Sequence, residues 1–285
     1  MVRFYTFEKF HSKKDVGSTR LRAHNLIKHW DEADLYKYGE HPDVLIFQKV
    51  YVTFDHQFPV NFKGIKILDV CDPDWKDTPD IFIKGTMDAM DAVVVPTESM
   101  REYLQQMTDT PVRIIKDRFE ISEFPRHKRH TKKAKTALWF GYAHNAVSVK
   151  FAMPSLEARD LNLICISNED PMLYKWANNS NAYEKKYKFI KYSHPPYKDI
   201  QRADVCIFPE SNRPFDRFKS ENKTVISQLC GVPVVKNAEE LDKMLDPKVR
   251  QKHIEENYAR LKKDYDCRKS VQMYKELINE LKSNR

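Results

Sequence analysis

The pattern that most constrains this chain is a repeated alternation of short apolar segments with helical segments. Examples of the apolar segments are DVLIFQKV at 43–50 and AVVVP at 92–96. Short, continuous apolar strands between helices indicate a parallel sheet that helices cover on both faces. The alternation occurs twice along the 285 residues, and that length favours two domains. We therefore expect an α/β protein with two doubly wound units.

The first unit is predicted over residues 1–125 and the second over residues 136–265, with a helical tail at 266–285. The expected strands are 2–6, 43–50, 66–70, 92–96, 112–115, 137–140, 161–166, 188–192, 204–208 and 233–235. The expected helices are 18–30, 81–90, 98–107, 147–158, 197–202, 221–230, 246–263 and 270–282. Two such Rossmann-like units predict a cleft between them, with ligands bound at the carboxyl ends of the strands.

A strongly basic stretch lies between the two predicted units. Residues 126–135, RHKRHTKKAK, contain six Lys or Arg and no acid, and we interpret them as a linker. The net charge of +8 favours an anionic partner such as a nucleotide, nucleic acid or a phosphorylated sugar, although a generally basic surface is the alternative. If the partner is nucleic acid, the candidate contacts are Arg126, Lys128, Arg129, Lys132 and Lys133.

Several classes of protein are disfavoured. The five cysteines are scattered and form no CxxC pair, so we expect neither a disulfide framework nor a structural zinc site. No apolar run approaches the ~18 residues of a membrane helix, and the N-terminus lacks the apolar stretch of a signal peptide, so a cytoplasmic location is expected. Neither a Walker loop nor a GxGxxG motif is present, which disfavours a nicotinamide cofactor.

Residues 219–235, KSENKTVISQLCGVPVV, carry the strongest chemical pattern. A helix is predicted to begin near Ser220 and to end at Gly231, before a buried strand. Lys219 and Lys223 are four residues apart, which predicts a shared face at the helix N-terminus. A helix N-terminus that carries lysines is suited to bind an anion. The alternative is an ordinary amphipathic helix with solvated lysines.

A second candidate anion site lies at Gly17, before the Ser-Thr pair of a predicted helix. Ser18 or Thr19 is expected to cap that helix, and a glycine there would allow the backbone to approach a ligand closely. The helix dipole and Arg20 would favour a phosphate.

Taken together, these segments resemble retaining GT-B glycosyltransferases. The segments on which the resemblance rests are ADVCIFP at 203–209, KSENK at 219–223, CGVPVV at 230–235, GSTRLR at 17–22, MDAVVVPT at 90–97 and WFGYAHN at 139–145. The resemblance implies transfer of a sugar from a nucleotide-sugar donor, such as a UDP-sugar, to a hydroxyl acceptor, with the nucleotide on the second unit and no metal or other cofactor. The donor-binding residues that it implies are Gly17, Ser18, Arg20, Gly141, Asn145, Lys219, Asn222 and Lys223, with His144 as a further donor to the diphosphate.

One departure from the family pattern bears on activity. Relatives usually have a glutamate three residues after the Asn-Lys pair, where this chain has Ile226. That glutamate typically contacts a hydroxyl of the donor sugar. The departure leaves open a catalytically inactive protein that binds nucleotide-sugars.

Asp72 and Asp74 follow the predicted strand 66–70, which places them at a carboxyl end of the first sheet. In the other major glycosyltransferase fold, a D-x-D pair holds a metal, but two alternating units favour GT-B. We therefore expect these carboxylates to bind the acceptor or to orient its nucleophilic hydroxyl. A proline-containing turn in which an aspartate caps the next helix is the alternative.

The acceptor is the least constrained part of the prediction. The chain is short for this fold, as are the phage-type enzymes that glycosylate hydroxymethylated pyrimidines in DNA, and its basic charge suits a polyanion. A target base in duplex DNA would have to flip out of the helix. A saccharide or small-molecule acceptor is the alternative.

Overall fold

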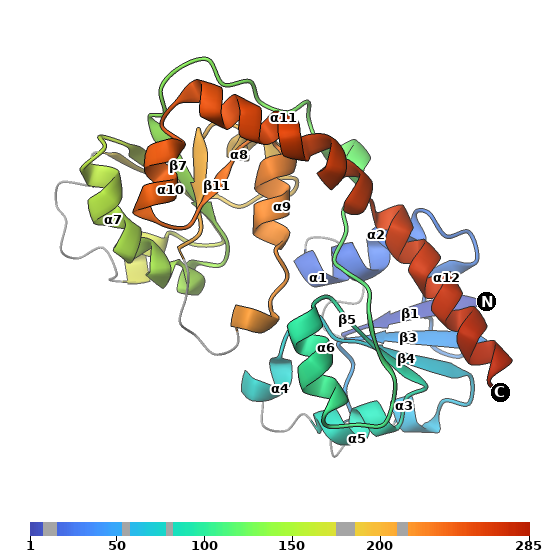
Figure 1. The fold of residues 1–285 in the computed structure, drawn as a ribbon. Coiled ribbons are helices and arrows are strands. Elements are labelled where there is room, and N and C mark those ends of the chain that lie inside the picture. The colour runs from blue at the N-terminus through green and yellow to red at the C-terminus, as the bar shows by residue number, and fades with distance from the viewer. Residues whose placement is uncertain (8–15, 53–57, 78–81, 175–185, 210–215) are drawn as a thin grey trace. The chain divides into compact units, whose positions relative to one another are not determined.

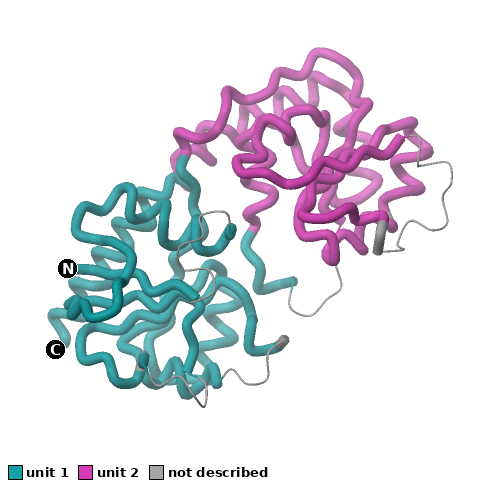
Figure 2. The backbone as a smooth tube through the Cα atoms, turned by 180° about the vertical axis from the view of Figure 1, so that it is seen from behind, with its two compact units in different colours: residues 1–120, 213–220, 265–285 teal, residues 121–212, 221–264 magenta. Residues whose placement is uncertain are grey.

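Two separate parallel sheets organise the chain in this computed structural model, which describes residues 1–7, 16–52, 58–77, 82–174, 186–209 and 216–285 (Figure 1). Unit 1 comprises residues 1–120, 213–220 and 265–285, and unit 2 comprises residues 121–212 and 221–264 (Figure 2). The two predicted doubly wound sheets are confirmed. None of the helices in the described chain combines the length and apolar composition needed to cross a membrane.

The sheet of unit 1 has six parallel strands in the order β2-β1-β3-β4-β5-β6. Their bounds are β1 Val2–Thr6, β2 Ala33–Leu35, β3 Val44–Gln48, β4 Ile65–Asp69, β5 Ala92–Val95 and β6 Val112–Ile114. The strand order reverses between β1 and β3, which is the switch point where doubly wound sheets bind ligands. Strand β2 was not predicted, because three residues that include an aspartate form no apolar pattern.

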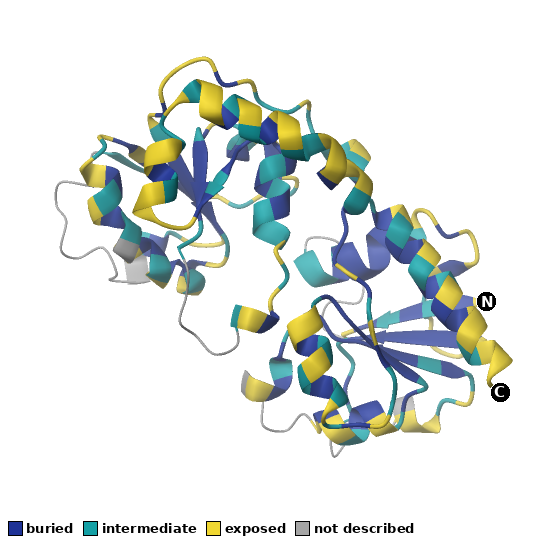
Figure 3. Cartoon of the chain, in the orientation of Figure 1, coloured by how far each residue is buried: buried dark blue, intermediate teal, exposed yellow. Residues whose placement is uncertain are grey.

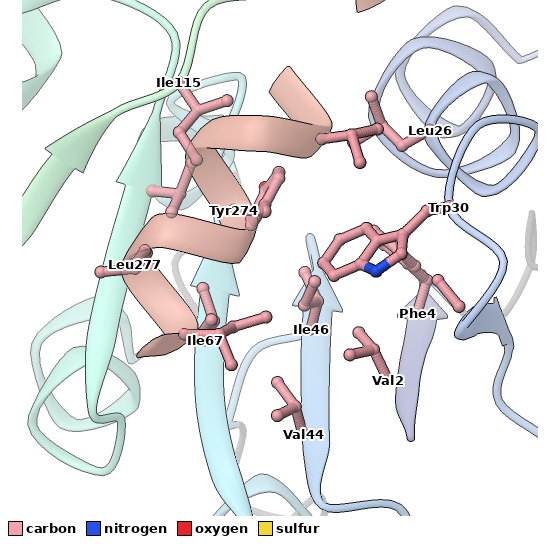
Figure 4. Packing of buried hydrophobic residues seen from close by; sticks show 14 of the residues in the cluster. Val2, Phe4, Leu26, Trp30, Val44, Ile46, Ile67, Ile115, Tyr274 and Leu277 are labelled. Carbon is pink, nitrogen blue, oxygen red and sulfur yellow. The ribbon is translucent and has the colours of Figure 1, made fainter. Parts of the chain in front are cut away.

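Helices cover both faces of this sheet. One face packs against the segment that contains α1 Gly17–Thr19, the π-helical turn Arg20–His24 and α2 Asn25–Ile27, and against α12 Cys267–Ser283. Figure 4 shows Tyr274 and Leu277 of α12 beside Ile46 and Ile67 of the central strands. Because the end of the chain supplies this cover, α12 is part of the core of unit 1 rather than a free tail.

The opposite face packs against α5 Ile83–Asp88 and α6 Glu98–Gln105. Two further short helices of unit 1 are α3 Phe58–Asn61 and α4 Asp74–Asp77. Ile81, the predicted start of a helix, lies outside the described residues. The predicted cap at Ser18 or Thr19 was wrong, because the helical segment already begins at Gly17 and has Val16 at its N-cap position.

The sheet of unit 2 has five parallel strands in the order β11-β10-β7-β8-β9. Their bounds are β7 Thr136–Phe140, β8 Asn162–Ser167, β9 Tyr187–Lys191, β10 Val205–Ile207 and β11 Val234–Val235. The helices around it are α7 Val149–Glu157, α8 Tyr197–Ile200, α9 Asn222–Leu229, α10 Ala238–Lys243 and α11 Pro247–Asp264. The switch point of this sheet lies between β7 and β10.

Burial follows the same rule in each sheet. Alternate residues of a strand enter opposite cores, as Trp139 and Leu138 of β7 do. In Figure 3 the strands are largely buried, whereas the outer faces of α11 and α12 are exposed. Buried polar residues occur at the carboxyl ends of several strands, namely Thr6, Gln48, Asp69 and Ser167.

Candidate active site

Lys223 lies at the switch point of unit 2, in the first turn of α9. Its ammonium nitrogen is 4.8 Å from the centre of the Trp139 ring and 5.4 Å from that of Phe208. Aromatic faces attract a cation without neutralising its charge. The aromatic rings of Trp139 in β7 and of Phe208 after β10 thus hold a positive charge at the carboxyl edge of the sheet.

Gly141 follows β7 and lies directly under this ammonium. Its φ is +152°, a conformation that residues with a side chain rarely adopt, and a Cβ there would be 2.6 Å from the Lys223 nitrogen. The backbone therefore requires glycine here, and a side chain would also displace the Lys223 ammonium. The structure brings together Gly141 and Lys223, two of the predicted donor-binding residues.

The loop after Gly141 carries two more of the predicted residues. It enters a 3-10 turn, Ala143–Ser148, whose first N–H donates to the side-chain oxygen of Asn168 at 3.0 Å. His144 is exposed and stacks on Tyr142 with a centroid distance of 5.8 Å. The amide nitrogen of Asn145 lies 3.1 Å from the Nε2 atom of His144. Both residues therefore lie in the loop that begins at the switch point.

Lys219 does not share a helical face with Lys223, so that prediction was wrong. Helix α9 begins only at Asn222, and the residues before Lys219 form a 3-10 turn, Asp216–Phe218, that belongs to unit 1. The Phe218 ring is buried there, and its carbonyl accepts a hydrogen bond from the Thr97 hydroxyl at 3.1 Å. Lys219 pairs with Asp216 at 3.0 Å. Lys219 therefore follows the turn that Phe218 anchors in unit 1, whereas Lys223 belongs to helix α9 of unit 2.

Ile226, at the position of the family glutamate, is partly buried and packs against the apolar core beneath α9. Its neighbours in that core include Leu138, Cys206 and Val232. In this chain the position serves packing, which agrees with its apolar side chain.

In unit 1, Asp72 and Asp74 converge on the ammonium of Lys49, which lies 3.0 Å from a carboxylate oxygen of each. The Tyr51 hydroxyl also donates to Asp74 at 2.9 Å. Burial raises the pKa of Asp74, and Lys49 opposes that shift. Burial acts to lower the pKa of Lys49, but Cys71 and the two aspartates outweigh it and raise that pKa.

Lys49 was missed by the sequence reasoning. It follows β3, whereas the D-x-D pair follows β4, and only the parallel pairing of these strands brings the three residues together. Its φ of +57° places a non-glycine residue in the left-handed region. Such conformations are often found at functional sites, because the surrounding structure must hold them in place.

A second charged cluster of unit 1 is centred on Arg22. Its guanidinium donates to Asp69 at 2.5 Å and to Asp117 at 2.8 Å. The Tyr274 hydroxyl donates to the other oxygen of Asp69 at 2.5 Å, and the Ser220 hydroxyl donates to Asp117 at 2.6 Å. The Nη2 atom of Arg22 is buried and has no hydrogen-bond partner among the described residues. The sequence predicted Arg20 as the anion-binding arginine of this segment. In the structure it is Arg22 whose side chain is buried in unit 1.

The remaining predicted donor-binding residues lie in the segment that begins at Gly17 and at the start of α9. Gly17, Ser18 and Arg20 are all partly buried. No atom in the described part of the chain lies within 4 Å of a Cβ added to Gly17, so these residues leave room for a side chain there. Asn222 is the first residue of α9. Asn222 therefore lies at the N-terminus of α9, directly before Lys223.

The basic linker divides into paired and exposed side chains. Lys128 donates to the Ala203 carbonyl at 2.6 Å and to the Asp204 carboxylate at 3.0 Å. Asp204 also accepts from the backbone N–H groups of Lys135 and Thr136, at 2.9 and 3.2 Å. Lys128 therefore fastens the linker to unit 2. The exposed cations of the predicted set are Arg126, Arg129, Lys132 and Lys133.

His130 and Arg250 hold the same stretch from the other side. The Arg250 guanidinium donates to the Nδ1 atom of His130 at 3.1 Å and to the carbonyls of Met244, Leu245 and Lys132 at 2.5–2.9 Å. His130 Nε2 lies 2.8 Å from the Gly231 carbonyl. Burial lowers the pKa of His130 to about 4, so this imidazole is neutral at pH 7.

No family model and no curated protein sequence matches this chain. Solved structures do match it. HepE from Anabaena in complex with UDP has 11% identity and a TM-score of 0.59, covering 98% of this chain and 99% of HepE. The T4 phage β-glucosyltransferase, BGT, with its UDP-glucose substrate has 9% identity and a TM-score of 0.60, covering 96% and 98%.

The chain has the GT-B fold. TarM is also similar, with 12% identity and a TM-score of 0.62 over 84% of this chain, but the chain spans only 56% of TarM. At these identities the likeness shows the fold alone. In GT-B terms, Gly141 and Lys223 lie on the C-terminal unit, whereas Lys49, Asp72 and Asp74 lie on the N-terminal unit.

Proposed function

We propose that this chain is a glycosyltransferase that moves a sugar from a nucleoside-diphosphate sugar, such as a UDP-sugar, to a hydroxyl group. The observation that carries the proposal is the Lys223 ammonium held against Gly141 between β7 and β10. Ligands of doubly wound sheets bind at this switch point, and a cation there suits a diphosphate. The complexes of HepE with UDP and of BGT with UDP-glucose, in the same fold, support the choice of donor.

In the proposed reaction, the bond between the sugar C1 atom and the diphosphate oxygen breaks, and its electron pair leaves with the nucleoside diphosphate. The acceptor oxygen forms the new bond to C1, and its proton passes to a diphosphate oxygen. Lys223 stabilises the charge that develops on the leaving diphosphate, with His144 as a further donor. On the acceptor side, Asp72 and Asp74 orient the hydroxyl, and the Lys49 ammonium that pairs with both carboxylates holds them in place. We propose retention of configuration, which requires no dedicated base.

We also propose that transfer needs no metal. One structure of BGT holds UDP and Mn²⁺, so the point requires a direct test. In this chain the Lys49 ammonium lies between the carboxylates that a metal would use. Transfer should therefore persist after treatment with EDTA. Loss of activity that Mn²⁺ restores would assign Asp72 and Asp74 to a metal instead.

The donor site is tested by titrating UDP into the protein and into a Lys223→Gln variant. Loss of a charge-assisted hydrogen bond costs about 1.5–3 kcal/mol, so affinity should fall roughly 10- to 100-fold. Lys243→Gln is the matched control, because Lys243 is an exposed lysine of α10 that pairs with Glu239. Unchanged affinity in Lys223→Gln would place the nucleotide elsewhere. Lys219→Gln then measures the contribution of the lysine that unit 1 holds.

For the acceptor, we propose a hydroxymethylated pyrimidine in duplex DNA. The specific observation is the exposed set Arg126, Arg129, Lys132 and Lys133 on a chain of net charge +8. BGT, which has the same fold, is described as a DNA-modifying enzyme. Replacing these four cations by Gln should flatten the salt dependence of duplex binding by roughly 0.9 log units per log unit of salt for each phosphate that the variant no longer neutralises.

Lys128→Gln serves as the control, because Lys128 is engaged by Ala203 and Asp204. It should change the slope little. If no duplex binding is detected even at low salt, a saccharide or small-molecule acceptor replaces DNA in the proposal.

Ile226 favours one alternative, a GT-B protein that binds nucleotide-sugars without transferring them. Slow hydrolysis of UDP-glucose in the absence of acceptor separates the two functions. A transferase should release glucose, and Lys223→Gln should abolish the release. Binding of UDP without any release of sugar would favour the inactive protein.

A further inference from the structure

A cluster of three metal-ligating side chains lies in unit 1, apart from the residues used above. A ring nitrogen of His29, a carboxylate oxygen of Glu120 and the Sγ atom of Cys267 all lie within 4.8 Å of one another. The imidazole of His29 is in direct contact with the Glu120 carboxylate. We propose that these three residues bind a zinc ion.

The backbone of unit 1 holds the three donors in place. The Phe119 N–H donates to the Tyr265 carbonyl at 2.8 Å, and the Cys267 N–H donates to the Phe119 carbonyl at 3.0 Å. These bonds fix Glu120 beside the first residue of α12. His29 follows α2, where its own N–H donates to the Leu26 carbonyl at 3.0 Å. Sites on such rigid elements need little rearrangement to bind a metal.

The next residue, Trp30, anchors the His29 turn to the core. Its ring is buried and meets Phe4 edge to face at 6.0 Å, and it lies 6.3 Å from the ring of Tyr274 in α12 (Figure 4). The turn that carries His29 and the helix that begins with Cys267 are therefore packed through the same aromatic cluster.

The chemistry of the donors selects zinc. A thiolate and an imidazole favour Zn²⁺ over Mg²⁺ or Mn²⁺, and a carboxylate completes a common three-residue set. Bond lengths of about 2.0–2.3 Å at tetrahedral angles require donor atoms roughly 3.3–3.7 Å apart, so each donor needs to shift by only about 1 Å. A water molecule would take the fourth position, because His29 is exposed to solvent.

The environment of Cys267 sets a condition on binding. Burial raises the pKa of its thiol to about 12, so zinc must displace a proton. The thiolate would then sit at the N-terminus of a 17-residue helix, whose dipole favours negative charge.

The experiment uses Zn²⁺ and Co²⁺ as probes on the full chain without any nucleotide. We expect one Zn²⁺ per chain in a competition titration against a zinc indicator, and a thiolate-to-cobalt absorption band when Co²⁺ is added. His29→Gln should weaken Zn²⁺ binding more than about 100-fold, since even indirect ligand partners contribute 10- to 100-fold. The melting temperature of the wild-type protein should rise with Zn²⁺ and that of the variant should not.

Matched control variants distinguish loss of this zinc site from loss of any histidine or any cysteine. His41→Gln removes another exposed histidine of unit 1, and Cys165→Ser removes a buried thiol of β8 in unit 2. Both should bind Zn²⁺ as the wild type does, whereas Cys267→Ser should lose the cobalt band. If Zn²⁺ does not bind at one equivalent, or binds equally to the His29 variant, the proposal is overturned. Because His29 is exposed, this test does not depend on whether a buried variant folds, and it is independent of the donor site.

Discussion

Each unit has a deeply buried arginine with several polar partners, Arg22 in unit 1 and Arg250 in unit 2, and these partners differ in charge. Arg22 of unit 1 is 3% exposed and donates to two carboxylates, Asp69 and Asp117, as well as to the Ile115 carbonyl at 2.9 Å. Arg250 of unit 2 is fully buried and donates to neutral groups, namely a histidine nitrogen and three backbone carbonyls. One arginine belongs to a charged network, whereas the other is a cation held by dipoles.

The pKa directions follow from these partners. Burial acts to lower the pKa of Arg22, but Asp69 and Asp117 outweigh it and raise that pKa well above its ordinary value. Burial lowers the pKa of Arg250, although the charges of Asp204 and Asp246 oppose it. Unit 1 therefore uses a buried charged network to join β4, the segment after β6 and α12, whereas unit 2 uses its arginine to fasten the linker.

The largest expected effect is that of Arg22→Met. It leaves the Asp69 carboxylate buried with only the Tyr274 hydroxyl, and an uncompensated buried charge costs about 3–5 kcal/mol of stability. Urea unfolding of unit 1 measures the loss. A double variant, Arg22→Met with Asp69→Leu, should recover much of it, because it removes both charges of that pair and leaves Asp117 hydrogen-bonded to the Ser220 hydroxyl. A loss below about 1 kcal/mol in the single variant would show that the pair is not tightly coupled to folding.

Arg250→Met should cost less, about 2–3 kcal/mol, because it leaves carbonyls without donors but no unpaired charge. The Met244, Leu245 and Lys132 carbonyls are the groups affected. Equilibrium unfolding followed by a probe in unit 2 measures it. The comparison fails if Arg250→Met destabilises the protein more than Arg22→Met does.

The smallest expected effect concerns acid pH. His130 has a pKa of about 4 in the folded chain, lowered by burial, against about 6.5 when unfolded. Between these values the unfolded chain binds more protons, so stability falls as pH falls. From pH 7 to pH 5 the loss should be about 2 kcal/mol. His130→Gln should remove this dependence, and the exposed His41→Gln should leave it unchanged; equal slopes in all three proteins would contradict the assignment to His130.

Much of the architecture was predictable because it depends on local patterns. Apolar runs such as 92–96, with helices between them, predicted two parallel sheets. Gly141 could be singled out because it directly follows the first predicted strand of the second unit. Boundaries and short elements were less predictable. Strand β2 has no apolar pattern of its own, since its pairing with β1 defines it. Helix α9 begins later than predicted, because the packing of Phe218 on unit 1 ends the preceding segment.

The sequence by itself determined the fold class, the basic charge and the residue types at the ends of the strands. Hydrophobic periodicity and turn residues act over a few neighbours, so they can be read from a single chain. Only the tertiary structure decided which charges meet. Lys49 joins Asp72 and Asp74, Arg22 joins Asp69 and Asp117, and His29 joins Glu120 and Cys267 across gaps of 23 to 238 residues. Such contacts depend on strand order and helix packing, which bring distant residues together without any mark in the local sequence.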